Sequence, residues 1–324
     1  MRVAYLGTHQ PMTDRGTPWT TETAWAATLE LLGHDVVRVD EATTPWHERV
    51  ALAEECDMLL WTSTWGYASR WPRDEAFRSI RYLNERIPTA AVHLDRWWGL
   101  ANRERQIRDN AMFRVRYVFT ADGDHGHLWE AEGVNHHWLP PGVYEPECVP
   151  GTPRAEWRAD VAFIGNWRDY GHAEHWQHRK AMIDALATRF GDRASFWPRD
   201  GEPAPWGLDY NDMLASVGAV VGDGWSGARH YFSNRCFETV GRGGFCVHPA
   251  VPGLVELLPE GMGGAYFAPG DWPAMCETIE RWLGDDAGRA DARAKGQQYV
   301  REHHSYTQRM TEMLTIMADD GAFR

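Results

Sequence analysis

Lysine is almost missing from this chain. Of its 324 residues only Lys180 and Lys295 are lysines, so arginine carries nearly all of the positive charge, which we attribute to codon bias rather than to function. Long apolar runs are missing too, and none approaches the roughly 20 residues that span a bilayer. The first residues reach Asp14 and Arg15 without the apolar core of a signal peptide. We therefore expect a cytoplasmic protein with no membrane span.

Paired cysteines are also absent. The cysteines are odd in number and widely spaced, and no two of them form a CxxC motif. This pattern argues against a disulfide framework and predicts reduced, mostly buried thiols. They are Cys56, Cys148, Cys236, Cys246 and Cys276.

An overall positive charge is missing, because the formal net charge is -13. This balance opposes long-range attraction to nucleic acid or to an anionic membrane. One stretch departs from the average, since eleven arginines and only six acidic residues lie between Arg70 and Arg116. The charge pattern alone favours a solvated helical face. A site for a polyanion such as DNA stays open as the alternative.

What is present is the composition of an ordinary folded protein. With 43% hydrophobic and 24% charged residues the chain is neither disordered nor fibrous, and its length suits two domains. Short apolar runs alternate with helical patterns, which is typical of a parallel α/β sheet. The first half is expected to form strands over residues 2–7, 34–40, 57–63, 89–95 and 116–122 and helices over 21–33 and 73–86.

A proline-rich break follows this first half. Residues 139–157 hold five prolines and two glycines, too many for the interior of an element, so they predict an interdomain linker. The alternation then restarts, with strands over 160–166, 194–198 and 219–224, a helix over 178–191, a helix, glycine turn and strand over 233–249, and helical residues from 272 to 318. We expect domains at 1–145 and 146–300, and a helix at 301–324 that can cross back to the N-terminal domain.

The second half of the chain resembles the glycosyltransferase-B superfamily, most closely the bacterial and phage group that includes spore-maturation-type and group 1-like glycosyltransferases. The likeness rests on DVAFIGN (160–166), NRCFETVGRGGFCV (234–247), PGLVELLPEG (252–261) and REHHSYTQRMTEML (301–314), and more loosely on LELLGHDV (29–36), YVFTAD (117–122) and EGVNHHWLPPGV (132–143). It implies an α/β fold of two Rossmann-like domains that face a cleft. It also implies a metal-independent enzyme without a cofactor, which transfers a sugar from a nucleotide-sugar such as a UDP-sugar to an acceptor hydroxyl.

The residues of that half suit a nucleotide diphosphate. Such a ligand needs its phosphate charge offset, its ribose hydroxyls bound by an acceptor, and close approach of backbone N–H groups. By the resemblance, Glu238 matches the glutamate that binds the ribose, and Arg235 on the same helix suits a phosphate. The other expected donor contacts lie in glycine loops or at a helix start, and they are Gly165, Asn166, Ser233, Asn234, Gly243 and Gly244.

Plainer interpretations of these donor residues stay open. Arg235 and Glu238 are spaced as a surface ion pair on one helix, and the two glycines suit a simple turn. Related retaining enzymes often carry a second glutamate eight positions before the ribose-binding one, and His230 occupies that position here. The stereochemical class therefore stays open.

Sugar transfer also needs a group that removes the proton of the acceptor hydroxyl. Asp95 and His93 follow an expected strand at the end where α/β folds place such groups. Asp95 is the preferred base and His93 the alternative. A purely structural role, in which one of them only binds the backbone or Arg96, also stays open. The expected acceptor-side contacts are His9, Asp14, Trp97 and Trp98.

Two patterns imitate metal sites. The run from Asp122 to Asp124 looks like the DxD element of single-domain glycosyltransferases, but we expect a polar loop there. The histidines at 125, 127, 172, 175 and 178 lack carboxylate or cysteine partners at fixed spacing, so we expect them to be solvated. We expect no metal site.

Other functions compete with the leading hypothesis. The arginine-rich stretch keeps open a phage-type enzyme that glycosylates hydroxymethylated bases in DNA. The same two-domain fold also hosts nucleotide-sugar epimerases and hydrolases, and a non-catalytic nucleotide-sugar-binding protein is the third possibility.

Overall fold

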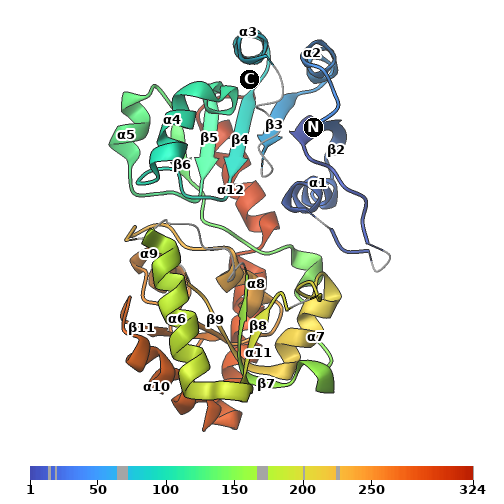
Figure 1. The fold of residues 1–324 in the computed structure, drawn as a ribbon. Coiled ribbons are helices and arrows are strands. Elements are labelled where there is room, and N and C mark those ends of the chain that lie inside the picture. Colours follow the sequence, from blue (N-terminus) through green and yellow to red (C-terminus); the bar gives the residue numbers. More distant parts are fainter. Residues whose placement is uncertain are drawn as a thin grey trace. The chain divides into compact units, whose positions relative to one another are not determined.

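The computed structural model describes residues 1–13, 16–18, 20–63, 72–165, 174–199, 201–223 and 227–323. The chain divides into two compact units (Figure 1). The first contains residues 1–140 and 306–324, and the second contains residues 141–305. Among the helices of the described ranges, none is both long enough and apolar enough to cross a membrane.

The first unit is built on a six-stranded parallel sheet. Its strand order, β2-β1-β3-β4-β5-β6, starts at β1, one strand in from an edge, and runs outward on both sides, which is typical of a doubly wound fold. The apolar runs of the sequence form its strands because both of their faces are covered. The strands are β1 (Arg2–Gly7), β2 (Asp35–Asp40), β3 (Met58–Thr62), β4 (Thr89–His93), β5 (Tyr117–Thr120) and β6 (His136–Trp138).

Helices cover both faces of this sheet. On one face Trp46, Ile80, Phe113 and Trp129 pack against alternate strand residues such as Trp61 in one hydrophobic core. The helices of this face are α2 (Trp46–Glu54), α3 (Arg73–Asn84), α4 (Ala101–Asp109) and α5 (Gly126–Ala131), with a 3-10 turn at Ala111–Arg114.

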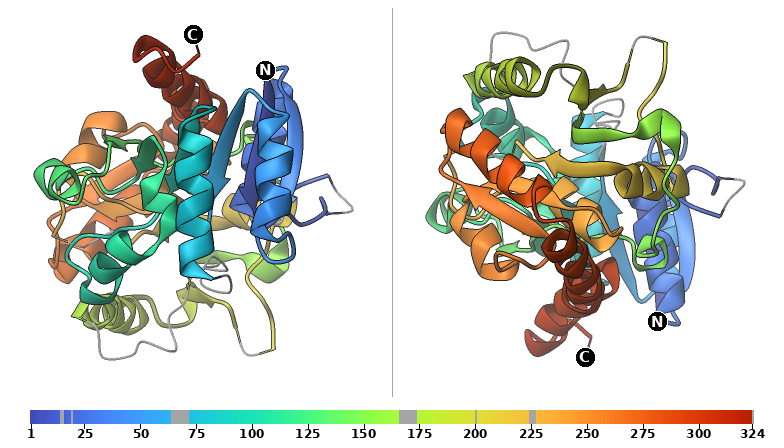
Figure 2. Two further views of the ribbon diagram at one scale, coloured as in Figure 1. Left: turned by 90° about the horizontal axis from the view of Figure 1, so that it is seen from above. Right: turned by 90° about the horizontal axis from the view of Figure 1, so that it is seen from below.

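The last helix of the chain, α12 (Tyr306–Asp319), belongs to this first unit and packs on α1 (Thr21–Leu31). Met310, Met313 and Met317 recur at helical spacing and are fully buried. The ring of Tyr306 lies 5.3 Å from the ring of Trp25 on α1. Both chain ends therefore lie in the first unit (Figure 2). Met1 and Phe323 line one surface groove.

The second unit carries a five-stranded parallel sheet in the order β11-β10-β9-β7-β8. Its strands are β7 (Ala159–Ile164), β8 (Ala194–Trp197), β9 (Val217–Val221), β10 (Cys246–Pro249) and β11 (Gly264–Phe267). The predicted α/β fold of two Rossmann-like sheets is therefore confirmed.

The helices of the second unit also lie on both faces of its sheet. Met182 and Leu186 of α6 and Ile279 of α10 share one core with Phe163, while Met213 of α7 packs on the opposite face. The helices are α6 (Glu174–Phe190), α7 (Leu208–Ser216), α8 (Arg235–Gly241), α9 (Pro252–Leu257), α10 (Trp272–Leu283) and α11 (Asp286–His303).

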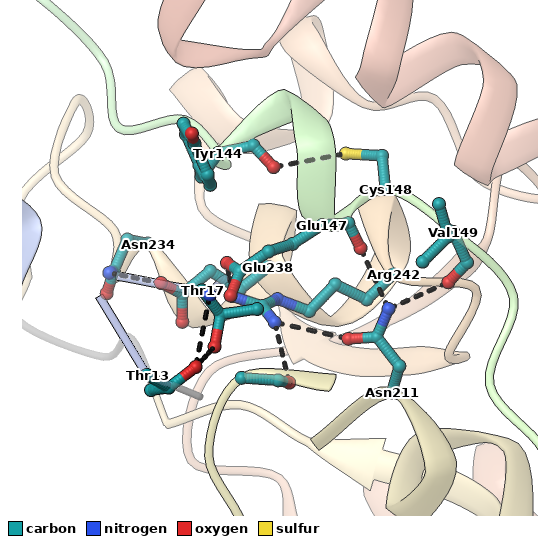
Figure 3. A network of polar contacts seen from close by, with 11 residues as sticks. Thr13, Thr17, Tyr144, Glu147, Cys148, Val149, Asn211, Asn234, Glu238 and Arg242 are labelled. Atoms are coloured by element: carbon teal, nitrogen blue, oxygen red, sulfur yellow. Dashed lines mark hydrogen bonds and ion pairs between the residues drawn. The ribbon is translucent and has the colours of Figure 1, made fainter. Parts of the chain in front are cut away.

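The proline-rich segment is held against the second unit by a buried ion pair. Arg242, directly after α8, reaches Glu147 of the 3-10 turn Glu145–Glu147, and their side chains are only 9% and 4% exposed (Figure 3). Asn211 of α7 accepts from the Arg242 guanidinium at 3.1 Å and donates to the Glu147 and Val149 carbonyls at 2.8 Å. Segment, α7 and α8 are thus joined in one polar network.

Replacement of Arg242 tests this network. Burial raises the pKa of Glu147 to about 7, and the Arg242 charge works against that rise. Arg242→Met leaves the carboxyl group buried without its cation, so we expect the free energy of unfolding to fall by about 3–5 kcal/mol. Denaturant unfolding measures it. The exposed pair Lys180–Asp184 supplies the control, since Lys180→Met should change stability by less than about 0.5 kcal/mol. Equal effects of the two substitutions would contradict the role of the network.

Candidate functional site

The carboxyl ends of β7 and β9 bring three charged side chains of the second unit together. Asp223, two residues after β9, accepts from Nε of Arg179 on α6 and lies 3.5 Å from Nη1 of Arg235 on α8. The side chains of Arg179, Asp223 and Arg235 are 17%, 10% and 23% exposed. Both guanidinium groups lie over the ring of Phe163 on β7, at 5.7 and 5.5 Å. Two cations thus share a single carboxylate at the edge of the sheet where α/β folds bind ligands.

Gly165 makes room for this cluster. A Cβ atom at this position would lie 2.8 Å from Nη2 of Arg235, so only a residue without a side chain lets the guanidinium settle over the end of β7. Gly165 donates its own N–H to the Trp197 carbonyl at 2.9 Å. The structure therefore brings Gly165 and Arg235 together as expected, but the glycine contributes space rather than a hydrogen-bond donor. Asn166 lies outside the described residues.

The first turn of α8 holds the next predicted donor residues. Oγ of Ser233 accepts from the Arg235 N–H at 3.3 Å, and Nδ2 of Asn234 donates to Oε1 of Glu238 at 3.1 Å. Arg235 thus pairs with Asp223 and Glu238 bonds to Asn234, so the described contacts do not include the ion pair between Arg235 and Glu238 that the sequence left open. Glu238 is only partly buried.

Gly243 and Gly244 do not form part of a phosphate-binding loop, which corrects the expectation from the sequence. Gly243, with φ of +83°, ends helix α8, and its N–H donates to the Val240 carbonyl at 2.9 Å. The Gly244 N–H donates to the Thr239 carbonyl at 2.8 Å. Both donors are therefore used to close the helix. A glycine turn after a helix and a glycine loop around a phosphate look alike in sequence, which explains the error.

The predicted catalytic pair of the first unit lies at the carboxyl end of β4. Nδ1 of His93 accepts from the Asp95 N–H at 3.1 Å, and the ring also bonds to the Ser63 backbone. A ring that accepts through Nδ1 is neutral and carries its proton on Nε2. Burial lowers the pKa of His93 to about 4, against the opposing charge of Asp95.

Asp95 itself is half-exposed and paired. Its Oδ2 accepts from Arg103 at 2.9 Å, and its side chain is 45% exposed. Burial works to raise the pKa of Asp95, but His93 and Arg103 outweigh it and the pKa is lowered. The carboxylate is therefore ionised near neutral pH, and Arg103 weakens it as a base.

Trp97 and Trp98 do not form an open platform, which is a second correction. They are 3% and 8% exposed and pack edge-on against Phe113 and Trp129, at 4.6 and 5.5 Å between ring centroids. Oδ2 of Asp122 accepts both of their backbone N–H groups, at 2.9 and 2.8 Å. Asp122 thus fixes this turn, a role that suits the polar-loop interpretation. Sequence alone does not tell a core indole from one that stacks on a sugar.

His9 lies two residues beyond β1. It donates through Nε2 to the Tyr5 carbonyl at 2.9 Å, and burial lowers its pKa. Thr23 of α1 holds the adjoining backbone of Gln10 through two hydrogen bonds of 3.1 and 2.9 Å. Asp14 lies outside the described residues.

The arginine-rich stretch is partly neutralised. Arg73 pairs with Asp109, Arg86 with Glu85, Arg103 with Asp95, and Arg108 with Glu132. Within the described part of this stretch, the exposed arginines that form no ion pair are Arg78, Arg81, Arg105 and Arg116. The described residues also contain no group of three or more histidine, cysteine or acidic side chains placed to hold a metal ion.

The sequence interpretation did not identify two residues of the charged cluster, Arg179 and Asp223. Arg179 lies within the helix predicted over 178–191 and Asp223 within the strand predicted over 219–224, but neither was singled out as a site residue. A signal was present for Asp223, since it is a charged residue at the carboxyl end of that predicted strand.

Comparison with known proteins places the cluster in a family domain. A family model described as glycosyl transferase-like matches residues 157–315, which include Arg179, Asp223, Arg235 and Glu238. No curated protein sequence matches the chain.

Solved structures with the same fold cover nearly the whole chain. Anabaena HepE in complex with UDP is 13% identical, with a TM-score of 0.58, over 98% of this chain and all of that one. An alpha-glucosyltransferase in complex with UDP is 12% identical, with a TM-score of 0.67, over 98% and 100%. Sucrose-phosphate synthase from Thermosynechococcus elongatus is 13% identical, with a TM-score of 0.56, over all of both chains. The prediction of the glycosyltransferase-B fold is confirmed, and residues 157–315 match a glycosyl transferase-like domain.

The buried neutral His93 predicts a specific loss of stability in acid. Its pKa of about 4 in the folded protein lies below the ordinary 6.5, so the unfolded chain binds the proton more readily. The stabilisation is complete above pH 6.5 and is lost as the pH falls towards 4. Between pH 7 and pH 5 the wild type should lose about 2 kcal/mol more free energy of unfolding than His93→Gln.

Urea unfolding at the two pH values measures this difference. His47→Gln, which changes an exposed histidine of α2, is the control and should follow the wild type. If His93→Gln and the wild type lose the same stability, the histidine is not held neutral in the folded protein.

Proposed function

We propose that the second unit binds a nucleoside diphosphate sugar, of which a UDP-sugar is the first candidate, and that the protein transfers the sugar to an acceptor hydroxyl. The observation that carries this proposal is the pair of guanidinium groups, Arg179 and Arg235, at the carboxyl end of β7, with Glu238 one turn further along α8. Solved structures of the same fold that contain UDP or UDP-glucose support the choice of nucleotide.

The chemistry requires charge stabilisation at the leaving group. When the bond between the anomeric carbon and the diphosphate oxygen breaks, negative charge develops on the diphosphate. Two arginines held in place before the reaction stabilise that charge without reorganisation. The Glu238 carboxylate can accept hydrogen bonds from the ribose hydroxyls, which fixes the nucleoside end of the donor.

We further propose Asp95 as the group that takes the proton of the acceptor hydroxyl, with His93 holding its backbone. Oδ2 of Asp95 is occupied by Arg103, while Oδ1 makes no hydrogen bond to the described residues. The neutral His93 ring accepts the Asp95 N–H, so it orients the residue that carries the base. The alternative assignment gives the proton to His93, but its ring is already engaged by the Asp95 N–H and by the Ser63 backbone.

A cytoplasmic location is part of the proposal. All five cysteines are unpaired and buried, which suits a reducing compartment.

DNA is a second candidate acceptor. An alpha-glucosyltransferase solved with UDP-glucose and DNA shares the fold at 12% identity, with a TM-score of 0.62 over 98% of this chain and 99% of that one. Within the described part of the Arg70–Arg116 stretch, the exposed arginines without an ion pair, Arg78, Arg81, Arg105 and Arg116, suit a phosphate backbone. Binding of duplex DNA that weakens steeply with added salt would favour this acceptor, and an absence of binding at low salt would remove it.

Replacement of Glu238 tests the donor site. UDP-, GDP-, ADP- and TDP-sugars are first compared by the rise in melting temperature that each produces, because a ligand that binds the folded state stabilises it. For the preferred donor, Glu238→Ala should raise the Kd by at least about tenfold through loss of hydrogen bonds to a charged group. The melting temperature without ligand should stay close to that of the wild type, since Asn234 is the hydrogen-bond partner found for this side chain.

The control variant is Glu260→Ala, which removes an exposed ion pair with Arg281 in the same unit. It should bind the donor like the wild type. An unchanged Kd for Glu238→Ala would remove Glu238 from the site. Incubation of the donor without an acceptor separates transfer from epimerase or hydrolase activity, since isomer or free sugar would appear in those cases.

A further inference from the structure

Asp223 occupies the place between the two arginines that a ligand phosphate would take. Its two carboxylate oxygens divide between them, with Oδ2 on Arg179 and Oδ1 at 3.5 Å from Arg235. The carboxylate is 10% exposed and thus more buried than either of its partners. One carboxylate thus faces two guanidinium groups.

The backbone around Asp223 is held firmly. The N–H of Gly222 donates to the Val247 carbonyl of β10 at 2.9 Å. A Cβ atom at Gly222 would lie 2.3 Å from Cδ2 of His248, so the glycine allows the buried imidazole to pack directly against the chain. His248 is 1% exposed and donates through Nδ1 to the Pro249 carbonyl at 2.9 Å. The carboxylate is therefore fixed at the end of β9.

The arginines are fixed from the other side. Both guanidinium groups lie over Phe163, and the bare backbone of Gly165 receives that of Arg235. A diphosphate that approaches the pair meets two cations already turned towards a carboxylate. It must share them with Asp223, whose negative charge also repels it.

This repulsion acts unequally on donor and product. The sugar transfer breaks the bond between the anomeric carbon and a diphosphate oxygen, joins that carbon to the acceptor oxygen, and passes the acceptor proton to a base. The released nucleoside diphosphate then has a terminal phosphate with a second ionisable oxygen of pKa about 6. Near neutral pH it carries about one more negative charge than the sugar donor. A carboxylate inside the phosphate site therefore weakens the binding of the product more than the binding of the donor.

We infer that Asp223 is a positioning residue that holds Arg179 and Arg235 ready for the diphosphate and lowers the affinity of the nucleoside diphosphate product relative to the nucleotide-sugar donor. The inference rests on the proposed function, because it takes this cluster as the diphosphate site. It assigns Asp223 a role in product release.

Calorimetric titration of the full chain with UDP and with UDP-glucose tests the inference. Asp223→Asn keeps the size of the side chain and removes its charge. We expect the Kd for UDP to fall by about tenfold and the Kd for UDP-glucose by about threefold, because the product has the greater charge. The UDP affinity of this variant should also decrease more steeply with added salt than that of the wild type.

Two further variants separate charge from folding. Asp223→Glu restores the charge and should bring the ratio of the two Kd values back towards that of the wild type. Asp160→Asn removes an exposed ion pair with Arg193 at the opposite end of β7 and should leave both Kd values unchanged. If Asp223→Asn fails to fold, as judged by its melting curve, Asp223→Ser takes its place in the same titration.

The outcomes are distinct. If the wild type binds UDP and the uncharged variants bind it equally or more weakly, Asp223 serves only to support the arginines and the inference is wrong. If neither the wild type nor any variant binds UDP or UDP-glucose, the proposed function fails together with the inference. A parallel gain for UDP and UDP-glucose would also overturn the inference, since the discrimination between product and donor would be missing.

Discussion

The proposed ligand site of the second unit depends on the repulsion between two arginines at the carboxyl ends of its parallel strands. Two partly buried guanidinium groups lie there with the Asp223 carboxylate between them. Partly buried charges of like sign repel strongly because little water screens them. An anion of suitable size relieves that repulsion, and a diphosphate presents the spread of oxygens that arginine binds well. Beside the cluster, Gly165 leaves room for the Arg235 guanidinium and Gly222 leaves room for the His248 ring.

Helix α8 links this cluster to the linker segment of the same unit. Its first turn carries Arg235 and Glu238, and the residue after its last turn, Arg242, holds Glu147 of the linker. The short helix is closed by Gly243 and Gly244, which use their N–H groups on its carbonyls. The N-terminal end of α8 therefore carries the residues that we propose contact the nucleotide, while its C-terminal end is held by buried contacts. Because one helix carries both features, substitutions that break the linker network should also displace Arg235 and Glu238.

Most of the fold could be predicted from the sequence, but only part of the candidate site could. Apolar runs that end in glycine or a polar residue identified strands such as β1 and β7 because both faces of a parallel sheet are buried. Short elements such as α2, α9 and β11 were missed, since fewer than three helical turns or four strand residues carry little periodic signal. Arg235 and Glu238 were predicted through a family likeness. Arg179 was not, because its partner Asp223 is 44 residues away and only the folded chain brings them together.

The two corrections have the same physical origin. Gly243 and Gly244 suit a helix end as well as a phosphate loop, and Trp97 and Trp98 suit a core as well as a sugar-binding surface. In each case local chemistry allows both outcomes, and long-range packing decides between them. Short sequence motifs do not predict the strand pairings and helix contacts that determine the outcome.

The central claim is that Arg179 and Arg235 bind the diphosphate of a nucleotide. Equilibrium titration of UDP against the wild type and Arg179→Gln/Arg235→Gln tests it most directly. The account predicts that the wild type binds UDP and that the double variant binds it at least about a hundredfold more weakly, as expected for loss of two charge-assisted contacts. Equal affinity of the two proteins for UDP would contradict it.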